Sequence, residues 1–158
     1  MTELKHFSPA TDRNIDWYFV DATALAMLDK ARELAGIPFN ISSNHRTHAQ
    51  DMKLAGFTGA HTSTPCSAFD ITFHDVAGAK EWVKDLEAKG WNFGKGMSAV
   101  NFNKLSALKL TDEIKCDAVR ILLACRDAGF CRVGINLKNL HCHIDNDTKY
   151  PHPAFFME

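Results

Sequence analysis

Apolar residues recur at spacings of three and four in three segments of the chain, a pattern typical of helices with one buried face. The first segment predicts a helix over residues 22–35, with Asp21 as its N-cap. The second covers residues 75–89, and the third starts from a cap at Thr111 and ends at Gly129. The chain is therefore expected to contain at least three helices that need a partner surface.

Four short runs of β-prone residues lie between or after these helices. They are residues 39–42, 68–73, 133–137 and 140–145. The resulting order is helix, strand, strand, helix, helix, strand, strand. This order predicts an α+β fold in which helices pack against a small, mainly antiparallel sheet.

Two stretches fit neither the helical nor the strand period. Residues 56–66 are rich in Gly, Ser, Thr and Pro, which favour turns, so we interpret them as an irregular loop. Residues 91–110 mix glycines and asparagines with aromatic and aliphatic residues, and we expect a lid or an insertion there. Because no repeat or linker is visible, we expect residues 1–158 to form a single domain.

The composition narrows the possible functions. A chain of 158 residues of which 46% are apolar can form one domain with a substantial core. Its 18 basic and 19 acidic side chains give a net charge of -1, which does not support nucleic-acid binding through phosphate contacts. No apolar run resembles a signal peptide or a membrane span, so we expect synthesis in the cytoplasm. The five cysteines are odd in number and contain no Cys-x-x-Cys pair, which argues against a disulfide framework and predicts that most of the thiols are reduced.

The last predicted strand carries three titratable side chains on one face. In residues 140–145, which read LHCHID, strand alternation turns His141, His143 and Asp145 to one side and the apolar residues to the other. An ordinary solvated strand face would explain polar residues at alternate positions. Two histidines and an aspartate within five positions nevertheless favour a functional site.

Two residues earlier in the chain are further candidates for the same site. Asp70 lies in an otherwise apolar strand, where a buried carboxylate needs a cation or several hydrogen bonds. His61 lies in the preceding turn-rich loop. Asp70 is about equally well explained as an acceptor of backbone N–H groups at a strand end. Two histidines and one aspartate that leave a fourth position for water would form a catalytic zinc site rather than a structural one.

Three blocks occur in a fixed order along the chain. They are ISSNHRT at residues 41–47, then AH at residues 60–61 with AFDI at residues 68–71, and finally HCHID at residues 141–145. This arrangement resembles the zinc peptidoglycan peptidases, which include D-alanyl-D-alanine carboxypeptidases, L-alanyl-D-glutamate endopeptidases of phage lysis systems, and the related hedgehog domain. The family pattern is a Ser-rich strand end followed by Arg, then Ser-x-His-x-x-Gly-x-Ala-x-Asp, then a late His-x-His or His-x-Asp strand. The resemblance covers most of the chain.

The resemblance implies one zinc ion held by His61, Asp70 and His143. A site with one anionic and two neutral ligands keeps a net positive charge, which lowers the pKa of water and polarises an amide carbonyl. By the same resemblance, His141 hydrogen-bonds the developing oxyanion or the attacking water.

The resemblance also suggests how substrate is bound. Arg46 matches the family's substrate-binding arginine, and its planar guanidinium suits a peptide carboxylate. A surface ion pair is the alternative explanation for Arg46. Ser43, in the same block, is expected to assist.

The chain departs from the family pattern in two places. The family has its first histidine seven residues before the aspartate, whereas Ser63 occupies that position here. Either the loop carries an insertion that keeps His61 as the ligand, or the site is altered. Several members also have an acidic general base three residues before the last histidine, where this chain has Leu140. Asp145 is then the candidate for the base or for a residue that orients a ligand.

The sequence thus predicts a zinc-dependent metallopeptidase that hydrolyses stem or cross-link peptides of peptidoglycan. Its expected partners are those peptides, without nucleic acid and without membrane insertion. A phage enzyme released to the cell wall, or carried in a virion, would explain cytoplasmic synthesis without an export signal. The alternatives are a non-catalytic zinc-binding module and a phage structural module with the same fold.

Overall fold

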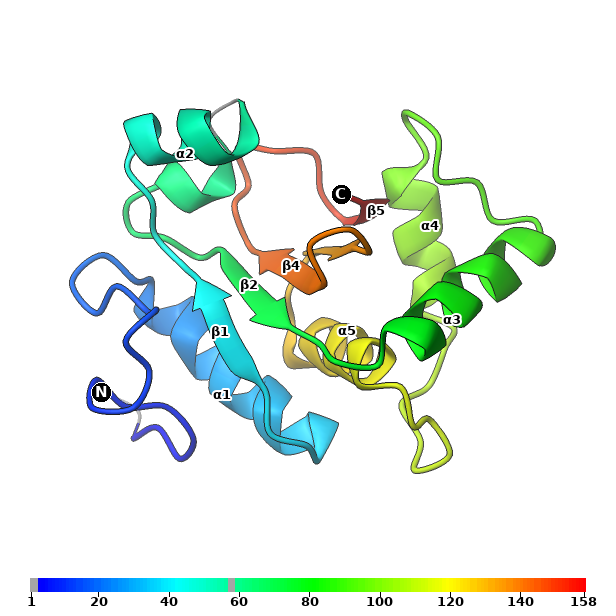
Figure 1. Cartoon of the computed structure of the whole chain (residues 1–158), viewed down its shortest axis with the longest axis horizontal. Helices are drawn as coiled ribbons and strands as arrows, with labels where there is room; N and C mark the ends of the chain where they lie inside the picture. Colours follow the sequence, from blue (N-terminus) through cyan, green and yellow to red (C-terminus); the bar gives the residue numbers. More distant parts are fainter. Residues whose placement is uncertain (1–2, 57–58) are drawn as a thin grey trace.

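A five-stranded sheet forms the centre of the computed structural model, which describes residues 3–56 and 59–158 (Figure 1). The strands are β1 (Asn40–Ser43), β2 (Phe69–Thr72), β3 (Arg132–Asn136), β4 (His141–Asp145) and β5 (Ala154–Met157). They lie in the order β1-β2-β4-β3-β5, and only the pair β3 and β5 is parallel. The predicted α+β class is confirmed, whereas the likeness to the peptidase fold stays a prediction.

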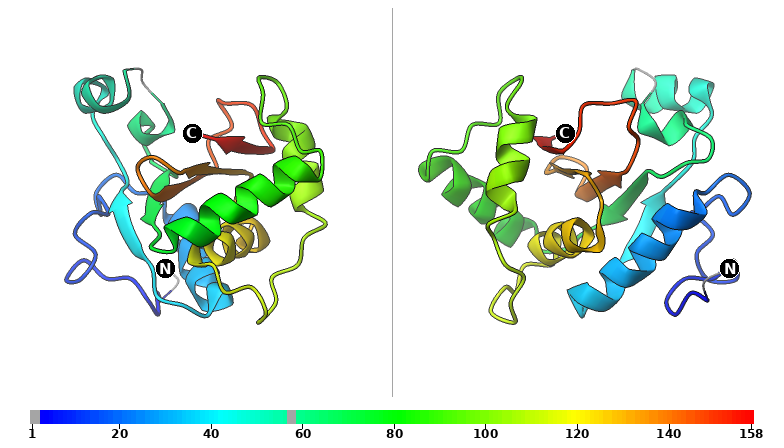
Figure 2. Two further views of the ribbon diagram at one scale, coloured as in Figure 1. Left: turned by 45° about the vertical axis from the view of Figure 1, so that its right-hand side comes forward. Right: turned by 180° about the vertical axis from the view of Figure 1, so that it is seen from behind.

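Helices surround this sheet. They are α1 (Ala22–Ala35), α2 (His48–Ala55), α3 (Val76–Ala88), α4 (Ser98–Leu105) and α5 (Asp117–Ala128), together with the 3-10 turn η1 (Ala60–Thr62). Figure 2 shows α1 and α5 together on one side of the sheet, with α3 and α4 beside the β5 edge. α2 and η1 lie at the other end of the molecule, near the top of Figure 1.

Strand alternation divides the sheet into an apolar face and a polar face. The apolar residues of the three central strands are fully buried and belong to the same core cluster as α1 and α5: they are Phe69, Ile71, Val133, Ile135, Cys142 and Ile144. Burial of each large side chain stabilises the fold by about 1.5–3 kcal/mol. Asp70, His143 and Asp145 occupy the intervening positions, so they point away from this core.

Two of the predicted helices have the expected ends. α1 begins after Asp21, whose Oδ1 accepts a hydrogen bond of 2.8 Å from the amide of Ala24. It ends at Gly36, which adopts a left-handed φ of 65°. α3 begins after Asp75, whose Oδ1 accepts from the amide of Gly78 at 2.9 Å.

The third helix starts later than the sequence predicts. α5 begins at Asp117, not after a cap at Thr111. The guanidinium of Arg120 donates to the carbonyl oxygens of Thr111 and Ile114 at 2.8 and 2.9 Å, and to that of Ala35 at 2.7 Å. These bonds hold the loop before α5 against the end of α1, a long-range effect that helical periodicity does not contain.

The stretch 91–110, expected to be a lid or an insertion, contains α4. Leu105 is fully buried, and the rings of Trp91 and Phe93 lie 6.1 and 5.6 Å from that of Phe155 in β5. The stretch therefore packs on the edge strand of the sheet and belongs to the core.

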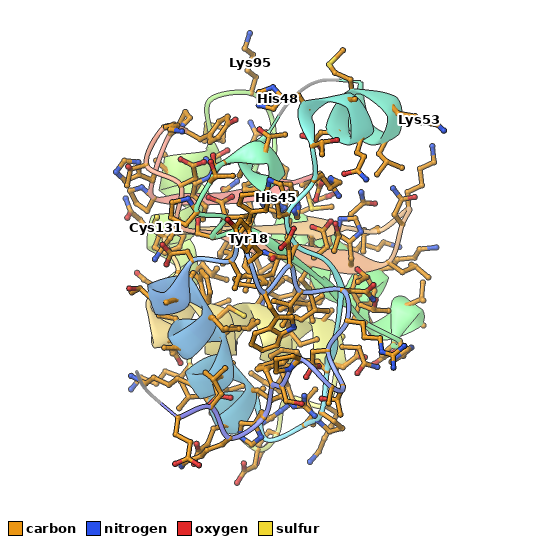
Figure 3. The ribbon with its side chains drawn as sticks, turned by 90° about the vertical axis from the view of Figure 1, so that its left-hand side faces the viewer. Tyr18, His45, His48, Lys53, Lys95 and Cys131 are labelled. Carbon is orange, nitrogen blue, oxygen red and sulfur yellow. The ribbon has the colours of Figure 1, made fainter. Side chains whose placement is uncertain are left out.

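The short helix α2 was missed because its apolar pattern is weak. Its only buried residue is Asp51, and Figure 3 shows the exposed side chains of His48 and Lys53 toward opposite ends of the helix. A capping box marks its start, since Thr47 Oγ1 accepts from the amide of Gln50 while Gln50 Oε1 accepts from the amide of Thr47.

All five cysteines are free, and three of them are buried. None of the helices in the described part of the chain has the length and apolar character needed to cross a membrane.

Candidate metal centre

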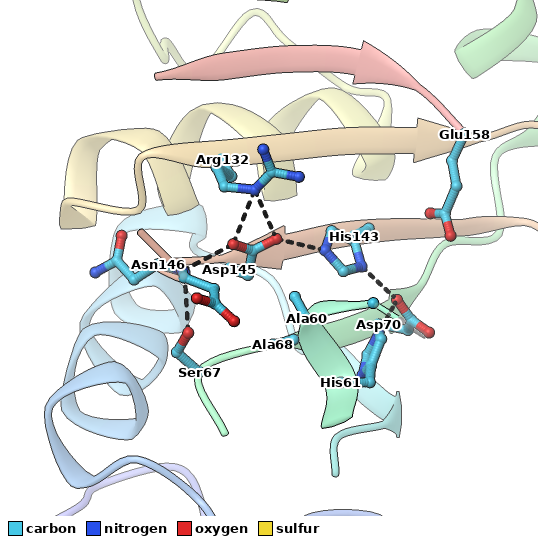
Figure 4. Close-up of polar contacts among 12 residues, drawn as sticks. Ala60, His61, Ser67, Ala68, Asp70, Arg132, His143, Asp145, Asn146 and Glu158 are labelled. Carbon is cyan, nitrogen blue, oxygen red and sulfur yellow. Dashed lines mark hydrogen bonds and ion pairs between the residues drawn. The ribbon is translucent and has the colours of Figure 1, made fainter. Parts of the chain in front are cut away.

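Three side chains from distant parts of the chain meet on the polar face of the sheet. Asp70 in β2 pairs directly with His143 in β4, and η1 brings His61 against them. Asp70 Oδ1 lies 3.2 Å from His61 Nε2 and 3.2 Å from His143 Nδ1 (Figure 4). All three side chains are buried, and their facing atoms lie within 4.8 Å of one another. The three residues are thus positioned to bind a metal ion.

The outer nitrogen of each histidine has its own acceptor. His61 Nδ1 hydrogen-bonds the carbonyl oxygen of Asn44, and His143 Nε2 lies 2.7 Å from Asp145 Oδ2. Such acceptors fix ring orientation and direct the other nitrogen of each ring toward a metal. Asn44 is itself fixed, because its Nδ2 donates to the carbonyl oxygen of Ala68 at 2.8 Å.

The electrostatics of the metal-free site depend on these short contacts. Burial opposes charge on Asp70, but hydrogen bonds from His143 and His61 outweigh it and hold the pKa of Asp70 far below its usual range. Burial also opposes protonation of His143, but hydrogen bonds to Asp145 and Asp70 raise its pKa to about 10. A proton therefore stays on His143 at neutral pH until a cation replaces it.

Asp145 belongs to a second ion pair behind His143. Its carboxylate is fully buried, lies 3.0 Å from Arg132 Nε, and accepts a 2.9 Å hydrogen bond from the amide of Asp147. Burial alone would raise the pKa of Asp145, but the hydrogen bond and the charge of His143 together have the larger effect. The pKa of Asp145 is therefore lowered below its ordinary value, and the carboxyl group stays ionised. Of the two roles predicted for Asp145, base or orienting residue, this geometry favours the second.

Arg132 is enclosed by aromatic rings. Its guanidinium carbon lies 5.3 Å from the ring centroids of both Tyr150 and Phe156. The ring of Phe156 lies close over β3, where a Cβ atom at Gly134 would approach it to 2.5 Å. A side chain at position 134 would therefore displace the ring beside His143.

The predicted substrate-binding residues lie next to the three ligands. Arg46 Nε donates to Asp51 Oδ1 at 2.8 Å, and its Nη1 lies 3.0 Å from Ser43 Oγ and 3.4 Å from Asp70 Oδ2. Among the described residues, no hydrogen bond occupies Arg46 Nη2. Ser43 thus holds the arginine, which keeps one donor group for another molecule.

His141 lies on the same strand face as the proposed ligands but has a different partner. Its Nε2 is 3.1 Å from Glu158 Oε2 and 3.7 Å from Asp70 Oδ1. Burial opposes charge on both members of this pair, but their mutual hydrogen bond raises the pKa of His141 and lowers that of Glu158. Asp70, His141 and Glu158 form a second group with mutually close ligand atoms. Sequence reasoning missed Glu158 because it did not predict β5, the strand that precedes this residue.

The structure shows where the residues at the two departures from the family pattern lie. His61 faces Asp70, whereas Ser63 points elsewhere and donates a hydrogen bond to Asp147 Oδ2. Leu140 precedes β4 with a left-handed φ of 57°, and its partly buried side chain packs against the core. No carboxylate occupies that position.

A cavity of about 140 Å³ opens beside the group. Its walls include Arg46, His61, Arg132, His143, Tyr150 and Glu158. Within the described ranges, no residue of the stretch 91–110 contributes to this wall.

Comparisons of the chain with protein-family models, with curated proteins and with solved structures found no match. The fold and the site together define an α+β protein with a buried His-Asp-His group positioned to bind a metal ion.

Proposed function

We propose that this protein is a zinc-dependent peptidase that hydrolyses stem or cross-link peptides of peptidoglycan. The observation that carries the proposal is the convergence of His61 Nε2, Asp70 Oδ1 and His143 Nδ1 beside an open cavity. The order of the sequence blocks supports the same class of enzyme.

The three proposed ligand atoms suit zinc, and their number suits a catalytic site. Two imidazole nitrogens and one carboxylate oxygen are ligands that zinc accepts, and a site with three protein ligands keeps a position for water or substrate. When bound, zinc would supply Lewis acidity that polarises the scissile carbonyl and lowers the pKa of water. The histidine acceptors Asn44 and Asp145 support such a site by fixing the two rings.

Arg46 is the proposed anchor for a substrate carboxylate. It lies in the wall of the cavity, and its Nε and Nη1 are fixed by Asp51 and Ser43. A fixed guanidinium loses little conformational entropy when it binds a carboxylate, which stem peptides carry at their D-alanine ends.

His141 is proposed to stabilise the oxyanion of the reaction or to hold the attacking water. Its Nε2 is on the metal-binding side of the sheet, 3.7 Å from Asp70. Because the same nitrogen contacts Glu158, contact with the oxyanion requires His141 to exchange that hydrogen bond for one to the substrate.

A non-catalytic metal-binding module is the second candidate. Leu140 favours it, since this residue replaces the acidic base of several family members and provides no proton acceptor. A phage structural module with the same fold would share this property.

One experiment separates these functions. The purified protein is assayed for zinc content and then incubated with disaccharide pentapeptides and with cross-linked muropeptide dimers, followed by mass spectrometry. We expect one zinc per chain and one cleaved peptide bond, with activity lost to a chelator and restored by zinc. One zinc per chain without cleavage of any stem peptide would favour the binding module, and absence of zinc binding would contradict the proposal.

Zinc binding at pH 7.5 is expected to release about one proton, because His143 is protonated in the metal-free protein and must be neutral as a ligand. Titration calorimetry in buffers of different ionisation enthalpy measures the number of protons released. The same heat in every buffer would show that no ligand gives up a proton.

A further inference from the structure

The cavity beside the proposed metal ligands contains one carboxylate that the proposed function has not used. Glu158 follows β5, and its side chain is about one third exposed, at 36%. Its Oε2 contacts His141 Nε2 at 3.1 Å. Among the described residues, no hydrogen bond occupies its other oxygen, Oε1.

The neighbouring carboxylates are already engaged. Asp145 is fully buried between Arg132 and His143. Asp51 accepts hydrogen bonds from Arg46 Nε and from the amide of Gly59 at 2.8 and 2.6 Å.

Asp147, behind Asp145, accepts hydrogen bonds from Ser63 Oγ and from the amide of Lys149. Asp70 is one of the proposed metal ligands. Glu158 is therefore the carboxylate with a free oxygen at the cavity, within the part of the chain that the structure describes.

The position of Glu158 suits proton transfer at the metal centre. One oxygen each of Glu158 and Asp70, with a nitrogen of His141, lie within 4.8 Å of one another. A single water molecule can span such a distance with two ordinary hydrogen bonds. A water in this gap would lie between the carboxylate and the place where the metal ligands converge (Figure 4).

We propose that Glu158 is the general base of the reaction, so that the carboxylate that follows β5 replaces the acid absent at Leu140. This inference rests on the proposed function. As the water oxygen bonds to the carbonyl carbon, Glu158 accepts one water proton. When the C–N bond breaks, that proton passes to the leaving nitrogen, which gives a carboxylic acid, an amine and an unchanged Glu158.

The test compares Glu158→Gln with the wild type in two independent measurements. Gln keeps the shape of the side chain but cannot accept the proton. We expect kcat on the cleaved muropeptide to fall by about 10²–10⁴-fold, the usual contribution of a general base, with little change in KM. Zinc content and zinc affinity, measured by competition with a chromogenic chelator, are expected to equal those of the wild type.

Two further variants serve as controls. Glu158→Asp keeps the carboxylate and is expected to retain more kcat than Glu158→Gln. Glu87→Gln makes the same change at an exposed position of α3, outside the cavity wall, and is expected to leave both measurements unchanged.

Three results would overturn the inference. An unchanged kcat in Glu158→Gln would remove Glu158 from the reaction while leaving the peptidase intact. A loss of zinc affinity that matches the loss of kcat would make Glu158 a metal ligand in place of a base. If the wild type binds zinc and cleaves no muropeptide, the proposed function and this inference fail together.

Discussion

Replacing Asp70 by Asn is expected to lower the affinity for zinc by about 10²–10⁴-fold and to reduce peptide hydrolysis to the background rate. Asn has nearly the same size but no charge, and Asp70 is the only anion among the three proposed ligands. Loss of one partner from a buried charged group costs about 3–5 kcal/mol, and each 1.4 kcal/mol is a factor of ten. The effect is large because Asp70 Oδ1 faces both histidines at 3.2 Å.

Thermal unfolding with and without zinc measures the same loss independently of activity. A ligand at 1,000 times its Kd stabilises the folded state by about 4 kcal/mol, so zinc should raise the melting temperature of the wild type and raise that of Asp70→Asn much less. Asp112→Asn, at an exposed position outside the site, is the matched control and should respond to zinc like the wild type. A normal response of Asp70→Asn would remove this residue from the metal centre.

Strand alternation predicted which side chains share a face, and this part of the prediction transfers well from sequence to structure. Asp70 and His143 occupy polar positions between apolar neighbours that the core buries. The register that pairs them directly across β2 and β4 is a property of the folded sheet. Strand alternation thus concerned His141, His143 and Asp145, and the family resemblance named Asp70 and His143 as ligands of one ion, whereas the register that pairs these two residues came from the structure.

His61 shows that the number of residues in a loop does not predict which of its side chains faces a site. The sequence left open whether an insertion or an altered site explains its distance from Asp70. In the structure, the segment before β2 forms an isolated parallel bridge between Val20 and Cys66, and the amide of Cys66 donates to the carbonyl oxygen of Phe19 at 2.7 Å. Tertiary contacts of this kind set the path of the loop, so the number of residues in it does not decide which side chain faces the candidate metal centre.

Glu158 could not be found from the sequence because β5 has no local signal. The segment Ala154–Met157 does not alternate, and Pro153 immediately precedes it. Its pairing is parallel to β3 and depends on the long connection from β4. By contrast, the capping box at Thr47 and Gln50 was visible in the sequence and would have predicted α2.

Replacing Arg132 by Met is expected to lower the free energy of unfolding by about 1.5–3 kcal/mol, because the buried Asp145 would lose one of its two cationic partners and keep only His143. Met keeps much of the apolar contact with Tyr150 and Phe156, so the loss reports mainly on charge and hydrogen bonds. Urea unfolding of the chelator-treated protein at pH 7 measures this change in the free energy of unfolding without a contribution from zinc. Arg13→Met, at an exposed position, is the control and should change stability by less than about 0.5 kcal/mol.

A second substitution separates the charge effect from packing. In the double variant Arg132→Met, Asp145→Asn, the buried carboxylate that lost Arg132 is itself removed, and part of the lost stability should return. Zinc affinity should nevertheless fall by about 10–100-fold in the double variant, which lacks the Asp145 carboxylate that fixes the ring of His143 through its 2.7 Å contact with Nε2. If the double variant is less stable than Arg132→Met alone, the ion pair is not the reason that Arg132 stabilises the fold, and the stacking of its guanidinium between the two rings becomes the better explanation.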